Sequence, residues 1–73
     1  MWIRSQDKKT LAYCTRLAVV GKTIQNLPPT GIDDDYDLMG VYESSERAIE
    51  LLNDIAETIK FVSESFIYKM PKK

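Results

Sequence analysis

The first residues that could support chemistry are the carboxylates of the run Asp33-Asp34-Asp35-Tyr36-Asp37. Carboxylates at alternate positions are the ligands that an EF-hand loop offers to calcium. If Asp33 is the first position of such a loop, Leu38 occupies the sixth position instead of glycine, and Ser44 occupies the twelfth instead of glutamate. The run therefore predicts no metal site, and a solvated loop is the simpler interpretation.

Cys14 is the single cysteine of a chain that contains no histidine. Acyl-transfer sites place a base, usually histidine, beside their nucleophile. Cys14 lies in an apolar segment, which favours a small buried side chain over a reactive thiol. One cysteine forms no intramolecular disulfide and does not complete a structural zinc site. We therefore expect no catalytic residues and no cofactor, and a protein that is not an enzyme.

A second acidic group recurs at intervals of four residues in a predicted helix, at Glu46, Glu50 and Asp54. Like charges at this spacing lie on the same side of a helix and repel one another mildly, so this side faces solvent or a basic partner. Together with the acidic run, it could mimic nucleic-acid phosphates toward a basic site on a partner protein. The candidate partner-binding residues are therefore Asp33, Asp34, Asp35, Asp37, Glu46, Glu50 and Asp54.

Basic residues offer an alternative function. Arg4, Arg16 and Lys22 could join Trp2 and Tyr13 on a sheet surface that stacks single-stranded bases. The formal net charge of -1, from ten basic and eleven acidic side chains, gives no overall attraction to nucleic acid. We therefore favour this alternative less than a protein partner. Uptake of a small nucleotide-like ligand is a third reading.

The spacing of the apolar residues changes near Ser44. Before Ser44 apolar and polar residues alternate as in strands, and we expect strands over residues 2–5, 10–20, 23–26 and 36–43. Gly21-Lys22 is a predicted two-residue turn, and Gly40 within a strand indicates a bulge or a close approach of the backbone.

After Ser44 the sequence predicts a helix. Ser44 and Ser45 are favourable N-cap residues, and the helix is expected to end near residues 63–65, before a terminal strand over 66–70. The predicted buried stripe consists of Ala48, Leu51, Leu52, Ile55, Ala56, Ile59 and Val62. The order β-β-β-β-α-β predicts an α+β fold, with one antiparallel sheet of four to five strands and one amphipathic helix packed on one face.

The predicted strand 10–20 is apolar on both sides. Leu11, Tyr13, Leu17 and Val19 alternate with Ala12, Cys14, Ala18 and Val20. Because one helix covers only one face of a sheet, we expect a second copy of the chain, or another partner, on the other face. A homodimer is the favoured form. The alternative is that neighbouring side chains and the proline-containing loop fold over this face.

Length and composition predict the compartment. The 73 residues suffice for one domain, 1–73, and are too few for a second core. The longest apolar stretch, 17–20, is far shorter than the roughly 20 residues that span a bilayer. Early charge and the lack of a long apolar run predict no signal peptide. We expect a cytoplasmic protein that contacts no membrane.

Several segments carry a resemblance to a known family. They are MWIRSQD at residues 1–7, Leu11, MGVY at 39–42, ERA at 46–48, LLNDI at 51–55 and YKMP at 68–71. Together they resemble a family of small uncharacterised proteins of phages, prophages and Gram-positive bacterial genomes, whereas residues 16–36 depart from it. The resemblance implies a phage or prophage accessory protein that binds a host or phage macromolecule in a bacterial cell, for example by inhibiting a host enzyme or defence system. It supplies no catalytic residues.

Overall fold

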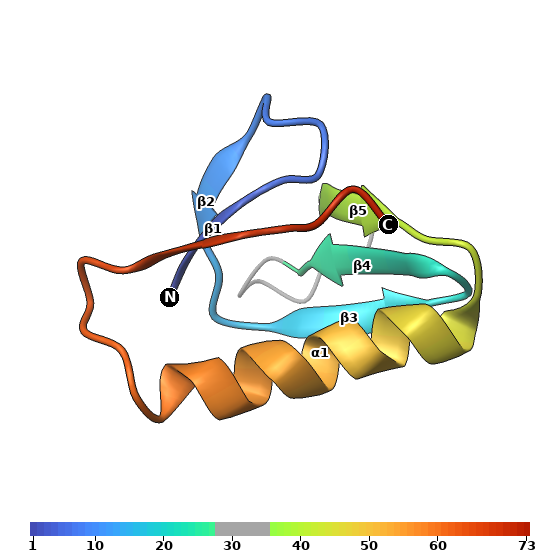
Figure 1. Ribbon diagram of the computed structural model, residues 1–73. Coiled ribbons are helices and arrows are strands. Elements are labelled where there is room, and N and C mark those ends of the chain that lie inside the picture. Colours follow the sequence, from blue (N-terminus) through green and yellow to red (C-terminus); the bar gives the residue numbers. More distant parts are fainter. Residues whose placement is uncertain (28–35) are drawn as a thin grey trace.

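The structure is a computed structural model that describes residues 1–27 and 36–73, which form six strands and one helix (Figure 1). In chain order these are β1 (Trp2–Arg4), β2 (Leu11–Tyr13), β3 (Leu17–Val20), β4 (Thr23–Asn26), β5 (Asp37–Val41), α1 (Ser45–Ile59) and β6 (Ile67–Lys69). The predicted α+β class is confirmed. The helix in the described part of the chain is not long and apolar enough to cross a membrane.

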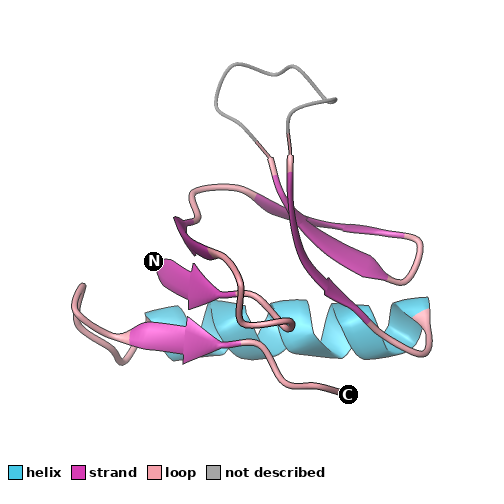
Figure 2. Cartoon of the chain, turned by 90° about the horizontal axis from the view of Figure 1, so that it is seen from above, coloured by secondary structure: helices cyan, strands magenta, loops and turns pink. Residues whose placement is uncertain are grey.

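The strands form two three-stranded sheets. Sheet A has the order β2-β1-β6, with β1 antiparallel to β2 and parallel to β6, and the arrows of β1 and β6 point the same way in Figure 2. Sheet B has the order β3-β4-β5 and is antiparallel. The prediction of a single antiparallel sheet was therefore wrong. Parallel neighbours need a long connection between them. The chain between β1 and β6 includes β2 to β5 and helix α1, so β6 can lie parallel to β1.

The predicted strand 10–20 is two strands that belong to different sheets. The chain bends at Thr15, after the Cys14 N–H has donated to the Met1 carbonyl (2.8 Å). Before the bend the core-facing side chain belongs to an even-numbered residue, Cys14. After the bend the core-facing side chains belong to odd-numbered residues, Leu17 and Val19, so the alternation has shifted by one residue. The strand is apolar on both sides because the side that faces the core changes at the bend.

Gln6 joins the two sheets. Its backbone N–H donates to the Met39 carbonyl (2.8 Å), and its side-chain amide accepts from the Val41 N–H and donates to the Val41 carbonyl (2.9 Å each). Gln6 thus fills part of the hydrogen-bonding edge of β5 as a strand residue would. The β1–β2 hairpin is thereby held against sheet B.

Helix α1 begins as predicted and ends earlier than predicted. The Ser44 hydroxyl accepts from the Arg47 N–H (3.1 Å), which confirms the N-cap. Figure 1 shows α1 running beneath β3 and β4. The buried helix residues are Ala48, Leu51 and Ile55, with Leu52 partly buried.

The prediction that the buried stripe continues to the C-terminal end of the helix was wrong. Ala56 and Ile59 are exposed, and Val62 lies beyond the helix, which ends at Ile59. Ser63 and Phe66 form a hydrogen-bonded turn (3.0 Å), and β6 lies within the predicted terminal strand.

Gly40 occupies the site of a bulge, as predicted. Ile24 pairs with Gly40 and Gln25 pairs with Leu38, so Met39 is the extra residue of β5. A Cβ atom at Gly40 would lie 2.6 Å from the ring of Tyr42, which is buried and donates to the Pro71 carbonyl (2.9 Å). Glycine at this position lets the Tyr42 ring pack directly on the strand.

Candidate functional site

The exposed aromatic side chains are the most unusual feature of the surface. The chain has one tryptophan, four tyrosines and two phenylalanines. Tyr42 and Tyr68 are buried, whereas the other five are at least 39% exposed. These five are Trp2, Tyr13, Tyr36, Phe61 and Phe66. Aromatic side chains contribute most to stability when they are buried, so these five leave much of that contribution unused.

The outer face of sheet A carries two of these aromatic residues. One row across the sheet pairs Tyr13 with Trp2 and Trp2 with Ile67, and the next row pairs Leu11 with Arg4 and Arg4 with Lys69. All six side chains are exposed, while Ile3 and Tyr68, which alternate with them, are buried. We call these six residues the aromatic-basic face.

The aromatic part of this face is organised. The rings of Trp2 and Tyr13 meet edge to face, with centroids 5.3 Å apart and an angle of 78° between their planes. Beside Tyr13, a hollow of about 180 Å³ is lined by Met1, Ile59 and Val62, among other residues. The apolar surface therefore continues from sheet A to the end of α1.

The basic part of the face borders a pocket of about 330 Å³. Its described lining residues are Arg4, Lys8, Lys9, Thr10, Leu11, Ile67 and Lys69, of which four are basic and none is acidic. The Arg4 guanidinium donates to the Lys8 carbonyl (3.2 and 3.4 Å), which fixes its position beside the β1–β2 turn. Lys8 has a φ of 67°, the left-handed conformation that suits this tight turn.

Asp7 is the acidic residue of the β1–β2 turn. Its carboxylate accepts from the Ser5 hydroxyl (2.6 Å) and from the Lys9 N–H (2.9 Å), and these two bonds, the Ser5 bond foremost, lower the pKa of Asp7. Asp7 therefore stays charged and holds the turn, and it is not among the residues that line the basic pocket.

Arg4, Arg16 and Lys22 do not lie on one sheet face. Arg4 is on β1, Arg16 lies between β2 and β3, and Lys22 lies in the turn between β3 and β4. The predicted constellation is therefore wrong, apart from Arg4. Lys69 was missed because its proximity to Arg4 depends on the parallel pairing of β6 with β1. A possible signal was the alternation of Ile67 and Lys69 around Tyr68.

The described residues of the predicted acidic partner site are divided between β5 and α1. Asp33, Asp34 and Asp35 lie outside the described residues. Asp37 begins β5 and accepts from the Asn26 amide (3.1 Å), whereas α1 follows the other end of β5. Glu46, Glu50 and Asp54 lie on α1 as predicted, so Asp37 is separated from them by the length of the strand.

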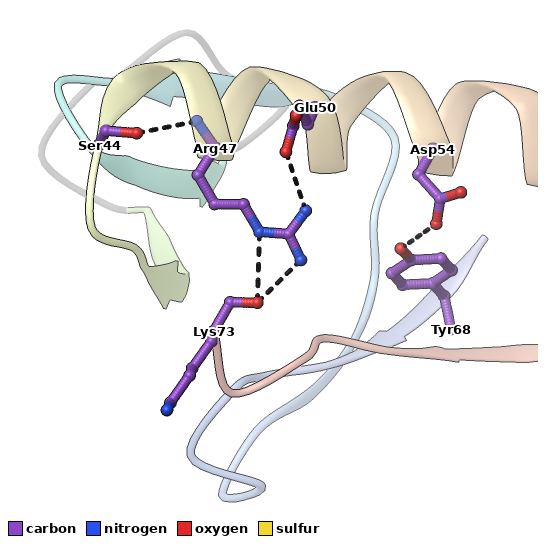
Figure 3. Close-up of polar contacts among 6 residues, drawn as sticks. All are labelled: Ser44, Arg47, Glu50, Asp54, Tyr68 and Lys73. Carbon is purple, nitrogen blue, oxygen red and sulfur yellow. Dashed lines mark hydrogen bonds and ion pairs between the residues drawn. The ribbon is translucent and has the colours of Figure 1, made fainter.

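Of Glu46, Glu50 and Asp54, the last two have partners within the chain (Figure 3). Glu50 forms an ion pair with Arg47 (3.1 Å), and Arg47 also donates to the Lys73 carbonyl (2.8 and 3.3 Å). Asp54 accepts from the Tyr68 hydroxyl (2.5 Å). The contact between Asp54 and Tyr68 joins the two sides of a groove of about 790 Å³ between α1 and β6. Asp54 therefore ties the helix to sheet A, and Arg47, which is paired with Glu50, ties it to the C-terminal segment.

Two buried groups, Tyr68 and Cys14, are held in their protonated forms. Burial, and then the hydrogen bond to Asp54, raise the pKa of Tyr68 well above its ordinary value, so it stays protonated. Burial raises the pKa of the Cys14 thiol to about 11, so it is no thiolate at neutral pH. In the described ranges, no group of three or more His, Cys, Asp or Glu side chains could hold a metal ion.

The outer face of sheet B differs from that of sheet A because its two described rows of side chains carry no charge. One row pairs Ala18 with Gln25 and Gln25 with Leu38, and the next pairs Val20 with Thr23 and Thr23 with Val41. We call these six residues the uncharged face. Val20, Leu38 and Val41 are between 44% and 51% exposed.

Comparison with protein families, with curated proteins and with solved structures finds no match to this chain.

Proposed function

We propose that this protein is a small accessory protein that acts by binding a macromolecule through the aromatic-basic face. The exposed pair of Trp2 and Tyr13, in the row beside Arg4 and Lys69, carries this proposal. Trp2 and Tyr13 are fixed against each other on a sheet, so they offer a large contact area with little loss of conformational entropy on binding. Such rigid aromatic anchors supply much of the free energy at interfaces.

The resemblance to phage and prophage proteins supports an accessory role in a bacterial cytoplasm. A protein partner that meets the acidic residues is an alternative at Glu46, whose carboxylate forms no ion pair or side-chain hydrogen bond among the described residues. Glu50 and Asp54 support this alternative less, because a partner would have to displace Arg47 or Tyr68. The aromatic-basic face requires no such displacement.

A capture experiment tests the proposal. The tagged protein would be incubated with lysate of a Gram-positive bacterium, and bound proteins and nucleic acids would both be identified. The variants are Trp2→Ala/Tyr13→Ala, which removes the aromatic pair, and Ile49→Ala, which removes an apolar side chain that is 48% exposed on α1. We expect a partner that binds the wild type and Ile49→Ala and is lost with the double variant. The same captured molecules with all three proteins would contradict the proposal.

Self-association is a second candidate, favoured by the uncharged face. Two copies that meet there bring no like charges together, whereas contact between two aromatic-basic faces would oppose Arg4 and Lys69 with their equivalents. We therefore propose the homodimer at sheet B. The proline-containing loop that was expected to cover the sheet includes residues outside the described ranges.

A further inference from the structure

We infer that the macromolecule bound at the aromatic-basic face is a single-stranded nucleic acid, an inference that rests on the proposed function. The first reason is charge complementarity. Arg4, Lys8, Lys9 and Lys69 line one pocket, whose described lining contains no acidic side chain. A phosphate backbone is the partner that satisfies several neighbouring cations at once.

The second reason is the position of the aromatic rings relative to these cations. Trp2 and Arg4 are two residues apart on β1, so they point outward from the same face, about 7 Å apart along the strand. The Tyr13-Trp2-Ile67 row thus lies directly beside the Leu11-Arg4-Lys69 row. A base stacked on Trp2 or Tyr13 would leave its phosphate within reach of the basic pocket.

A single strand fits this face better than a duplex does. Stacking on an aromatic side chain requires a base whose flat face is free, and the bases of a duplex are stacked on one another. The aromatic rings would therefore contribute little against duplex DNA.

The net charge of -1 does not oppose this inference, because the charged side chains in the described lining of the basic pocket are all basic. The Tyr68 side chain leaves the inner face of sheet A and reaches Asp54, so Asp54 lies toward that inner face. Four of the five charged residues of α1 are acidic. Two of them, Glu50 and Asp54, line the groove between α1 and β6, and none of the four is among the residues that line the basic pocket.

Trp2 is the single tryptophan, so its fluorescence reports binding at this face without a label. The wild-type protein would be titrated with oligothymidylate and oligouridylate of twelve nucleotides and with a duplex of equal length. We expect quenching of Trp2 by the single strands and weaker binding of the duplex. With three to four phosphates neutralised, log K should fall with log salt concentration with a slope of about -2 to -3.

Three variants identify the face. Tyr13→Ala should weaken binding about tenfold or more, because one stacking partner is lost, and should leave the salt slope unchanged. Lys8→Gln/Lys9→Gln should make the slope shallower by about 1.4, since two phosphate contacts are lost. Lys22→Gln is the matched control for a lysine in a turn, and should change neither quantity. Circular dichroism checks that each variant is folded.

No binding of any single strand at low salt would overturn the inference, as would binding that Tyr13→Ala and Lys8→Gln/Lys9→Gln leave unchanged. If oligonucleotides do not bind but capture of a protein still requires Trp2 and Tyr13, the proposed function stands and the nucleic acid is replaced by a protein partner. If neither oligonucleotide binding nor protein capture depends on this face, both proposals fail.

Discussion

Sheets A and B each have three strands, and each packs one face on the core and turns the other outward. The inner faces are alike: Ile3 at the centre of sheet A and Ile24 at the centre of sheet B are both fully buried. The outer faces differ in chemistry. Sheet A presents aromatic rings and cations, whereas sheet B presents short aliphatic and uncharged polar side chains.

This difference separates the requirements of folding from those of binding. A buried aliphatic residue at the centre of each sheet is what a small core requires, and the two inner faces meet that requirement in the same way. Folding places no comparable requirement on the outer faces. Large aromatic residues beside cations on only one of them therefore indicate a use for that face beyond stability.

The largest expected effects compare the two sides of the sheets. Ile3→Ala and Ile24→Ala should each lower the free energy of unfolding by about 2–5 kcal/mol, because each opens a cavity in the core. Trp2→Ala, on the neighbouring position of β1, should cost about 1 kcal/mol, chiefly its contact with Tyr13. Urea unfolding followed by circular dichroism measures all three.

Because a domain of this size has little stability to lose, Ile3→Val, with an expected cost of about 1 kcal/mol, keeps the comparison measurable if Ile3→Ala does not fold. A loss for Trp2→Ala as large as that for Ile3→Ala would show that the outer face of sheet A serves folding. The argument from exposed aromatic residues would then fail.

Self-association tests the other outer face. A standard interface buries about 800 Å² per partner, roughly one sixth of the 5120 Å² accessible surface of this chain. Six side chains provide less than that, so we expect a weak dimer, with a mass that rises from 8.4 kDa toward twice that value only at high concentration. Light scattering across a concentration series measures it.

Leu38→Lys places a charge within the uncharged face, on β5, and should hold the protein at the monomer mass. Ile49→Lys is the matched control, because Leu38 and Ile49 are both 48% exposed and Ile49 lies on α1. A wild type that stays monomeric at high concentration would remove the homodimer. If both variants weaken the dimer equally, the contact depends on exposed apolar side chains in general and not on sheet B.

Much of the fold could be predicted from local signals. The N-cap at Ser44, the Gly21-Lys22 turn and the bulge at Gly40 all follow from residues close together in the chain. The bend at Thr15 could not be predicted in this way. No glycine or proline marks it, and the two apolar sides of 10–20 fit a continuous strand equally well.

The candidate site depended on that missed bend and on a long-range pairing. Arg4, Trp2 and Tyr13 were recognised as a basic and aromatic group, but Arg16 and Lys22 belong with sheet B once the chain bends. Lys69 reaches Arg4 only because β6 pairs with β1 across more than sixty residues of sequence. Register between distant strands is fixed by the assembled core, which local patterns do not specify.

The smallest expected effect concerns Cys14, on the inner side of the bend where the two sheets meet. Burial raises the pKa of its thiol from 9.0 to about 11. Between these values the unfolded chain loses the proton while the folded chain keeps it. The contribution of this group to stability is therefore fully present below pH 9 and is lost as the pH rises toward 11.

Urea midpoints measured between pH 7 and 11 should be level to about pH 9 and then fall, and the fall should begin later in Cys14→Ala. Some alkaline loss should remain in that variant, because burial raises the pKa of Tyr42 and of Tyr68 in the same direction. Identical profiles for wild type and Cys14→Ala would mean that water reaches the thiol. The junction between the sheets would then be open, and the two outer faces could move independently instead of being held on one core.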